Sequence, residues 1–405
     1  MQRAMPIKFA ELSLHSSGVA TPNTFVVNRV HVEIYRRSRM SELVFPNALI
    51  QRVLRRVRKP WTQRVAREEL GRQAEFAEQL LAQLARDGQL GPDAEALSIR
   101  STVLTRSDVV VALIGARGRL EPRLVLKLPL TPDAERSTSD HRQVVSTLHG
   151  LPELHAFCAF VPRAVAWGDL QERPYYVETA LPGVGAADLV RRQAEPVSMM
   201  QDAARLIGQL HLATLRRQTV DEALFARLAG DDLAMLRQLV DGWPEASLLR
   251  QKLDQLDELL RRQLVGYDLP FSWTHGDFWP GNLLIQPAVG EIGGIVDWDG
   301  ASADQIPLHD LLHLLAYTRK LQRRSELGDE IVSYLLPAAF DKYARSLVKE
   351  AIAQLGLPTS GEFFQAITLL YWLRFAATNL SRYPVFQRDS RWLKNNVFLV
   401  LKRGI

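Results

Sequence analysis

The stretch Thr274-His-Gly-Asp-Phe-Trp-Pro-Gly-Asn-Leu-Leu-Ile285, followed by Gly293-Gly-Ile-Val-Asp-Trp-Asp299, decides how the fold of this chain is interpreted. The Pro-Gly pair predicts a sharp turn in which the backbone can approach another group closely. Asn282 then opens one apolar run, and a second apolar run ends at Asp297. The two runs predict a β hairpin that brings Asn282 and Asp297 side by side, with Asp277 on the same rim.

The side chains on this rim are oxygen donors. They are two carboxylates and an amide. A small number of hard oxygen ligands suits a Mg²⁺ ion that is bound together with substrate phosphates. Protein kinases place four residues between a catalytic Asp and a metal-binding Asn, and Asp277 and Asn282 have that spacing. Asp and Asn also favour ordinary turns, so a purely structural role stays open. His275 and Asp299 are expected to anchor the loop and to support the site rather than to react.

The motif His-Gly-Asp-x-x-Pro-Gly-Asn, with Ile-Val-Asp-Trp-Asp after it, resembles the aminoglycoside phosphotransferase and choline kinase-like family, which shares the protein-kinase fold. The likeness covers roughly residues 98–380. It implies that Asp277 is the catalytic base, that Asn282 and Asp297 bind Mg²⁺, and that ATP phosphorylates a small-molecule hydroxyl acceptor. It also implies that Asp310, in the following Pro-Leu-His-Asp element, is a structural support.

A kinase further needs a strand lysine that contacts the α- and β-phosphates and is oriented by a helix Glu. Lys127 fits this role, because the leucines of Leu124–Leu128 face one way and Lys127 faces the other. In the helix that follows, the place of the Glu falls at His141. The acidic partner of the lysine therefore stays open, with Asp140 and Glu135 nearby.

The nucleotide side of the likeness has one further match and one departure. The resemblance implies a hinge between the lobes at Glu178-Thr-Ala180, where Glu178 and Ala180 would bind the nucleotide. The glycine-rich phosphate loop is missing, because the first β turn reads Thr105-Arg-Ser-Asp108. A catalytically weak or inactive kinase-like binding protein, a pseudokinase, is therefore the alternative to an active kinase.

The hydrophobic pattern is first typical of strands and later in the chain typical of helices. Together with the resemblance, this order implies a bilobal α+β protein-kinase-like fold. We expect an extension over 1–97, irregular and then helical and basic, a small β-rich N-lobe over 98–180, and a large, mostly helical C-lobe over 181–405 with the catalytic loop and metal site. Strands are predicted at 98–105, 108–114, 123–130, 164–167 and 175–179. Helices are predicted at 49–59, 62–86, 140–148, 199–215, 233–240, 247–264, 307–321, 330–335, 342–355, 362–380 and 391–401.

Composition excludes several classes of protein. Of the 405 residues, 47% are hydrophobic and 23% charged, which is typical of globular domains and excludes a wholly disordered chain. No apolar run approaches the length of a membrane span, and the N-terminus lacks the apolar core of a secretory signal. Cys158 is the single cysteine, so neither an intrachain disulfide nor a thiolate metal cluster can form. A cytoplasmic protein is the simplest expectation.

The positive charge is concentrated near the N-terminus. The net charge is +5, yet residues 28–72 contain twelve basic and four acidic residues, which is +8 and leaves −3 for the rest. The arginines of the helix predicted at 49–59 suit a solvated helix face, or weak contact with an anionic membrane surface. We expect no nucleic-acid partner, because Trp61 is the one aromatic residue within 49–61 and no recognition motif is present.

The charge of the helical lobe bears on the acceptor. Residues 302–405 contain fourteen basic and nine acidic residues, whereas a polycationic antibiotic is best held by a carboxylate-rich pocket. A sugar or another hydroxylated metabolite is therefore favoured over an aminoglycoside. The sequence predicts neither the identity of the acceptor nor the oligomeric state.

Overall fold

The computed structural model describes residues 60–405, apart from 92–93, 106, 117, 120 and 193–195. The helix predicted at 49–59 lies outside the described residues. Within the described ranges, none of the helices combines the length and the apolar character that crossing a membrane requires.

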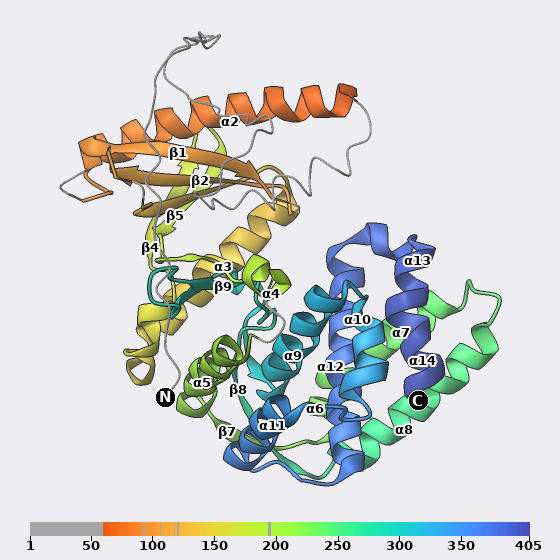
Figure 1. The fold of residues 1–405 in the computed structure, drawn as a ribbon. Coiled ribbons are helices and arrows are strands. Elements are labelled where there is room, and N and C mark those ends of the chain that lie inside the picture. Colours follow the sequence, from red (N-terminus) through yellow and green to blue (C-terminus); the bar gives the residue numbers. More distant parts are fainter. Residues whose placement is uncertain (1–59, 92–93, 106, 117, 120, 193–195) are drawn as a thin grey trace, which may run out of the picture. The chain divides into compact units, whose positions relative to one another are not determined.

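The small lobe is built on a five-stranded antiparallel sheet with strand order β1-β2-β3-β5-β4 (Figure 1). All five strands predicted for it are present. Their bounds are β1 Leu97–Leu104, β2 Val109–Ala116, β3 Leu124–Pro129, β4 Ala164–Leu170 and β5 Arg173–Thr179.

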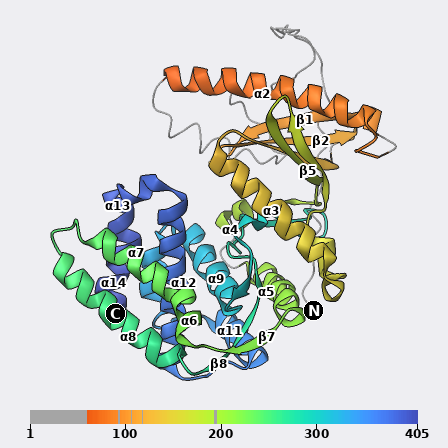
Figure 2. The ribbon, with the colours of Figure 1, turned by 180° about the vertical axis from the view of Figure 1, so that it is seen from behind.

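Two helices flank this sheet on opposite sides (Figures 1 and 2). Helix α2, Pro60–Arg86, buries Phe76 and Leu80 in the same core as Leu126 of β3. Because side chains alternate along a strand, Lys127 faces the side opposite the leucines, as predicted, and that side is the one toward helix α3. The outer helix therefore seals one sheet face and leaves the other for the site.

Helix α3 spans Pro132–Gly150 and is longer than the predicted 140–148. Thr131 caps it, accepting a hydrogen bond from the Ala134 N–H, and Pro132 stands in the first turn, where its missing N–H costs nothing. The buried stripe of its first half is made of small and polar residues such as Thr138 and His141. Apolar periodicity is therefore weak there, which is why the sequence pattern missed the start of this helix.

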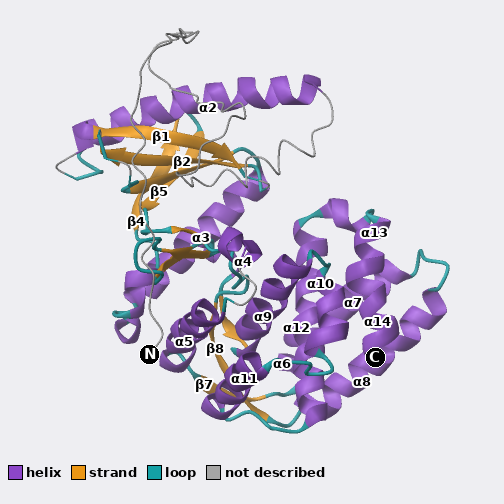
Figure 3. Ribbon diagram, in the orientation of Figure 1, coloured by secondary structure: helices purple, strands orange, loops and turns teal. Residues whose placement is uncertain are grey.

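The large lobe is mostly helical, as predicted, with two small three-stranded sheets (Figure 3). The strand orders are β10-β9-β6 and β11-β8-β7. The strands are β6 Val184–Gly185, β7 Arg216–Thr219, β8 Asp268–Thr274, β9 Leu283–Ile285, β10 Ile292–Ile295 and β11 Ser302–Gln305. The α-helices are α4 Ala187–Arg192, α5 Val197–Ala213, α6 Glu222–Phe225, α7 Asp231–Val240, α8 Ala246–Leu264, α9 Leu308–Arg323, α10 Leu327–Glu330, α11 Lys342–Leu355, α12 Gly361–Arg382, α13 Ser390–Leu393 and α14 Leu399–Gly404.

The decisive stretch folds as the predicted hairpin. Strands β9 and β10 pair in antiparallel fashion, with Leu283 opposite Ile295. The Val296 N–H donates to the Asn282 carbonyl at 2.9 Å, which closes the pair one residue further out. Asn282 therefore lies immediately before one strand and Asp297 shortly after the other, at the same end of the hairpin.

Candidate active site

The loop before the hairpin is held by a buried carboxylate. Asp310, on α9, accepts hydrogen bonds from the backbone N–H groups of His275 at 2.8 Å and Gly276 at 3.0 Å, and its other contact is His211 Nε2 at 3.0 Å. Burial opposes the charge on Asp310, but these donors hold its pKa below the usual range. The contacts are those of the structural support that we expected.

His275 ties the same loop to the hairpin. It is fully buried, its Nε2 donates to the Val296 carbonyl at 3.0 Å, and its Nδ1 accepts from the Asp277 N–H at 3.3 Å. Gly276 between them has φ +77°, and a Cβ there would lie 2.2 Å from the Gly300 carbonyl oxygen. The His-Gly-Asp order therefore has a steric reason, since only glycine fits the middle position.

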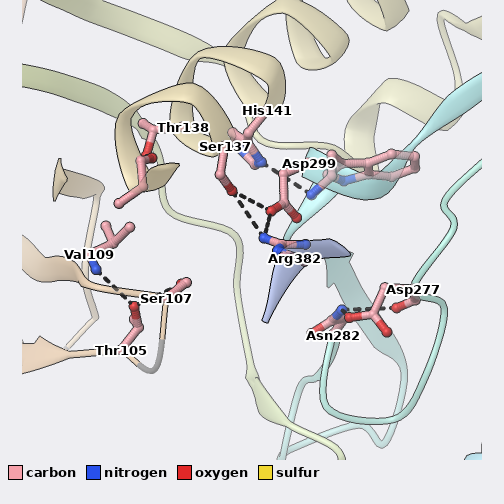
Figure 4. A network of polar contacts seen from close by, with 12 residues as sticks. Thr105, Ser107, Val109, Ser137, Thr138, His141, Asp277, Asn282, Asp299 and Arg382 are labelled. Atoms are coloured by element: carbon pink, nitrogen blue, oxygen red, sulfur yellow. Dashed lines mark hydrogen bonds and ion pairs between the residues drawn. The ribbon is translucent and has the colours of Figure 1, made fainter. Parts of the chain in front are cut away.

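Asp277 is held by a donor on each carboxylate oxygen, and Figure 4 shows the contact with Asn282. Asn282 Nδ2 donates to its Oδ2 at 3.0 Å and to its backbone carbonyl at 2.9 Å, while His313 Nε2 donates to its Oδ1 at 3.1 Å. Partial removal from water opposes ionisation, but hydrogen bonds from His313 and Asn282 lower the pKa of Asp277 below its usual range. The side chain is 48% exposed, so an ionised and fixed carboxylate faces an open space that can receive a substrate hydroxyl.

His313 is a contact of this carboxylate that the sequence analysis missed. Its Nδ1 lies 3.0 Å from the hydroxyl of Tyr371 on α12. With the Tyr371 O–H donating to Nδ1, the remaining ring N–H of His313 points to Asp277. A signal was available, because His313 lies three residues after Asp310 and hence on the same face of α9.

The metal ligands implied by the resemblance fit a magnesium ion that is shared with phosphates. Both N–H groups of the Asn282 amide point toward Asp277, which leaves its Oδ1 free for a cation. The Asp297 carboxylate is exposed and makes no hydrogen bond to any described residue. Within the described ranges no three His, Cys, Asp or Glu side chains gather into a metal site, so phosphate oxygens would complete the coordination.

Lys127 forms a buried ion pair with Glu178, 2.9 Å from Nζ to Oε1, and Glu178 Oε2 lies 2.6 Å from His141 Nε2. The acidic partner of the lysine therefore comes from β5 and not from α3, so neither Asp140 nor Glu135 takes that place. Burial opposes the charge on Glu178, but Lys127 and His141 lower its pKa to about 2. Burial likewise opposes the charge on Lys127, while Glu178 raises its pKa.

His141 joins this pair to the loop after Asp297. Its Nδ1 accepts a hydrogen bond from the Trp298 N–H at 3.1 Å, and its ring lies edge-on to Tyr176. His141 thus occupies the helix position that the sequence analysis assigned to a kinase Glu, and it connects the lysine to the candidate metal loop.

The remaining nucleotide-side residues lie around this sheet. The Ala180 N–H donates to the Arg123 carbonyl at 2.9 Å, so that donor is used within the protein. In the first β turn, Thr105 Oγ1 lies 3.0 Å from Ser107 Oγ and accepts from the Val109 N–H at 3.2 Å (Figure 4). The Thr105 hydroxyl therefore closes this turn, which has no glycine at 105–108. Nucleotide binding by Glu178 and Ala180 stays a prediction.

Comparison with known proteins gives one family match. A model of the phosphotransferase enzyme family, APH, matches residues 105–345, which is more than half of the chain. None of the curated proteins matches the chain.

Several solved structures are similar to this chain. One is a thermostable mutant of aminoglycoside phosphotransferase APH(4)-Ia, with 14% identity over 76% of this chain and 96% of that chain, and a TM-score of 0.47. Another is APH(3'')-Id from Streptomyces rimosus ATCC10970 with ADP and streptomycin, with 16% identity, coverage of 74% and 97%, and a TM-score of 0.41. A third is glucosamine kinase with glucosamine, ADP and inorganic phosphate, with 19% identity, coverage of 78% and 84%, and a TM-score of 0.39.

Proposed function

Because the chain belongs to the phosphotransferase enzyme family, we propose that it transfers the γ-phosphate of ATP, in an Mg²⁺-dependent reaction, to a hydroxyl of a small molecule. The observation that carries the proposal is the arrangement around Asp277. Its carboxylate is ionised, fixed by Asn282 and His313, and open to substrate, and the exposed Asp297 carboxylate stands at the same end of the hairpin.

Each residue has a defined task in this reaction. Lys127 contacts the α- and β-phosphates, and Glu178 keeps its ammonium group in place. Asn282 Oδ1 and Asp297 hold the magnesium ion, which neutralises phosphate charge when bound. Asp277 orients the acceptor hydroxyl, whose oxygen bonds to the γ-phosphorus while the bond to the β–γ bridging oxygen breaks. ADP leaves with that oxygen, and Asp277 takes the hydroxyl proton late, as expected for a loose transition state.

A sugar or another hydroxylated metabolite is the acceptor that we favour over an aminoglycoside. Four carboxylates of the segment that continues beyond α9 accept hydrogen bonds at helix caps: Glu326 and Asp329 form a capping box at α10, Asp341 caps α11, and Asp389 caps α13. These groups are therefore less available to a polycationic antibiotic than the count of acidic residues suggests.

The second candidate function is a pseudokinase that binds its ligand without turnover. Two observations favour this function. The first β turn contains no glycine, and the carboxylate that pairs with Lys127 comes from β5 and not from α3. An ADP-release screen over sugars, amino alcohols and aminoglycosides separates the two functions and identifies the acceptor. We expect Mg²⁺-dependent ADP release with a sugar or another hydroxylated metabolite. ATP binding with no ADP release from any acceptor would favour the pseudokinase.

Loss of the metal ligands should weaken ATP binding only when Mg²⁺ is present. We expect Asp297→Asn to reduce the affinity for ATP in Mg²⁺ by about tenfold, the effect of removing one charged contact worth about 1.4 kcal/mol. Affinity measured by calorimetry in EDTA should be unchanged. An equal loss in both conditions would show that Asp297 acts on the nucleotide without the metal.

The remaining assignments concern the chain as a whole. We propose three parts, which are an extension over 1–97, an N-lobe over 98–180 and a C-lobe over 181–405. We also propose a cytoplasmic location, where ATP is supplied. The basic N-terminal segment is assigned weak contact with an anionic membrane surface. Binding to anionic liposomes that survives deletion of residues 1–60 would remove that assignment.

A further inference from the structure

A polar cluster joins the loop after Asp297 to two helices from different lobes (Figure 4). Ser137 Oγ, on α3, donates to Asp299 Oδ2 at 2.5 Å. Arg382, the last residue of α12, forms an ion pair with the same Asp299 oxygen and donates from Nη2 to Ser137 Oγ at 3.0 Å. We refer to Ser137, Asp299 and Arg382 as the clasp.

The clasp differs from the surface ion pairs of this protein. The Asp299 side chain is 16% exposed, and it accepts from a hydroxyl as well as from the guanidinium group. Burial opposes the charge on Arg382, but Asp299 raises its pKa. A charge-assisted contact that is partly removed from water is stronger than an exposed pair such as Arg205 with Asp202.

The clasp fixes the loop that carries Asp297. Ser137 and His141 lie four residues apart, on one face of α3. They contact consecutive residues of the loop, since His141 accepts from the Trp298 N–H and Ser137 donates to Asp299. Arg382 closes the loop from the other side, so the position of Asp297 depends on contacts from both lobes.

Helix α12 reaches both carboxylates of the site. Tyr371 contacts His313, which in turn contacts Asp277. Arg382 forms the ion pair with Asp299, two residues beyond Asp297. The same helix thus sets the group that receives the acceptor hydroxyl and the loop of the metal ligand.

We propose that Arg382 is a positioning residue for phosphoryl transfer, which holds the Asp297 loop against α3 and couples it to the acceptor side through α12. The inference rests on the proposed function. A small misplacement of a reacting group lowers the reaction rate strongly. Loss of the clasp should therefore change kcat and the Mg²⁺-dependent part of the ATP affinity more than the KM for the acceptor.

The test compares Arg382→Met with Arg388→Met, which removes an exposed arginine of the next segment that makes no ion pair to a described residue. Calorimetry gives the affinity for ATP with Mg²⁺ and with EDTA, and steady-state kinetics with the acceptor found in the screen gives kcat and KM. In Arg382→Met we expect kcat to fall about tenfold or more, the Mg²⁺-dependent gain in ATP affinity to shrink, and affinity in EDTA to stay the same. Arg388→Met should behave as the wild type.

Two further variants keep the test informative if Arg382→Met fails to fold. Ser137→Ala removes one clasp contact without burying a charge, and it should show the same pattern to a smaller degree. Arg382→Lys keeps the charge and should recover part of the metal-dependent gain. An unchanged kcat and gain in Arg382→Met, or an equal loss in Arg388→Met, would overturn the inference. A wild type without any Mg²⁺-dependent gain would instead refute the proposed function, and the inference with it.

Discussion

Asp277→Ala should lower kcat for phosphoryl transfer by about 10²–10⁴-fold, the usual contribution of a positioned general base, while ATP affinity stays within about twofold. The carboxylate that orients the acceptor hydroxyl is lost, but Lys127, Asn282 and Asp297 remain. His313 and Asn282 lose an acceptor at a half-exposed position, where water can replace it. Steady-state ADP release and ATP calorimetry on the same preparation measure the two effects.

The matched control for this variant is Asp169→Asn. Asp169 is an exposed residue of β4 in the small lobe, away from the loop of Asp277. It should keep both turnover and ATP affinity. Full turnover in Asp277→Ala would rule out Asp277 as the base, and a parallel loss of ATP binding would show that Asp277 belongs to the nucleotide site.

Glu178→Gln should destabilise the protein by about 3–5 kcal/mol at neutral pH, because removing one partner leaves the Lys127 ammonium group buried without its carboxylate. The effect depends on pH. Folding lowers the pKa of Glu178 to about 2, so its contribution is fully present above its unfolded pKa and is lost as the pH falls from about 4.5 toward about 2. The difference in stability between wild type and variant should therefore shrink on acidification.

Urea unfolding across this pH range measures that difference. Glu153→Gln, which changes an exposed glutamate of the small lobe, is the control and should follow the wild-type curve. A gap between wild type and Glu178→Gln that stays constant from pH 7 to pH 3 would contradict the buried pair. The same variant should also bind ATP more weakly, since Lys127 loses the group that orients it.

The sequence predicted the parts of the site that are set by local order. Asp277, Asn282 and Asp297 lie within 21 positions of one another, and the turn and hairpin between them follow from nearby residues. Alternation in β3 likewise predicted that Lys127 faces the side of the strand opposite the leucines. The partner of that lysine could not be predicted in this way, because Glu178 meets it only through the pairing of β3 with β5.

Contacts between distant segments could not be predicted from local sequence patterns either. Arg382 follows Asp299 by 83 positions and Ser137 by 245, and nothing in the local order of an arginine at a helix end marks its partner. Strands β7 and β11 were missed because they are four-residue, polar edge strands that flank β8, with no apolar alternation.

Phosphorus NMR of the wild type with ATP, Mg²⁺ and the acceptor from the screen distinguishes phosphoryl transfer from hydrolysis of ATP. We expect ADP and a new phosphomonoester signal to appear together in equal amounts, and both to be absent in EDTA and in Asp277→Ala. ADP accompanied only by inorganic phosphate, or an ester that forms undiminished in Asp277→Ala, would contradict a phosphotransferase that works through this carboxylate.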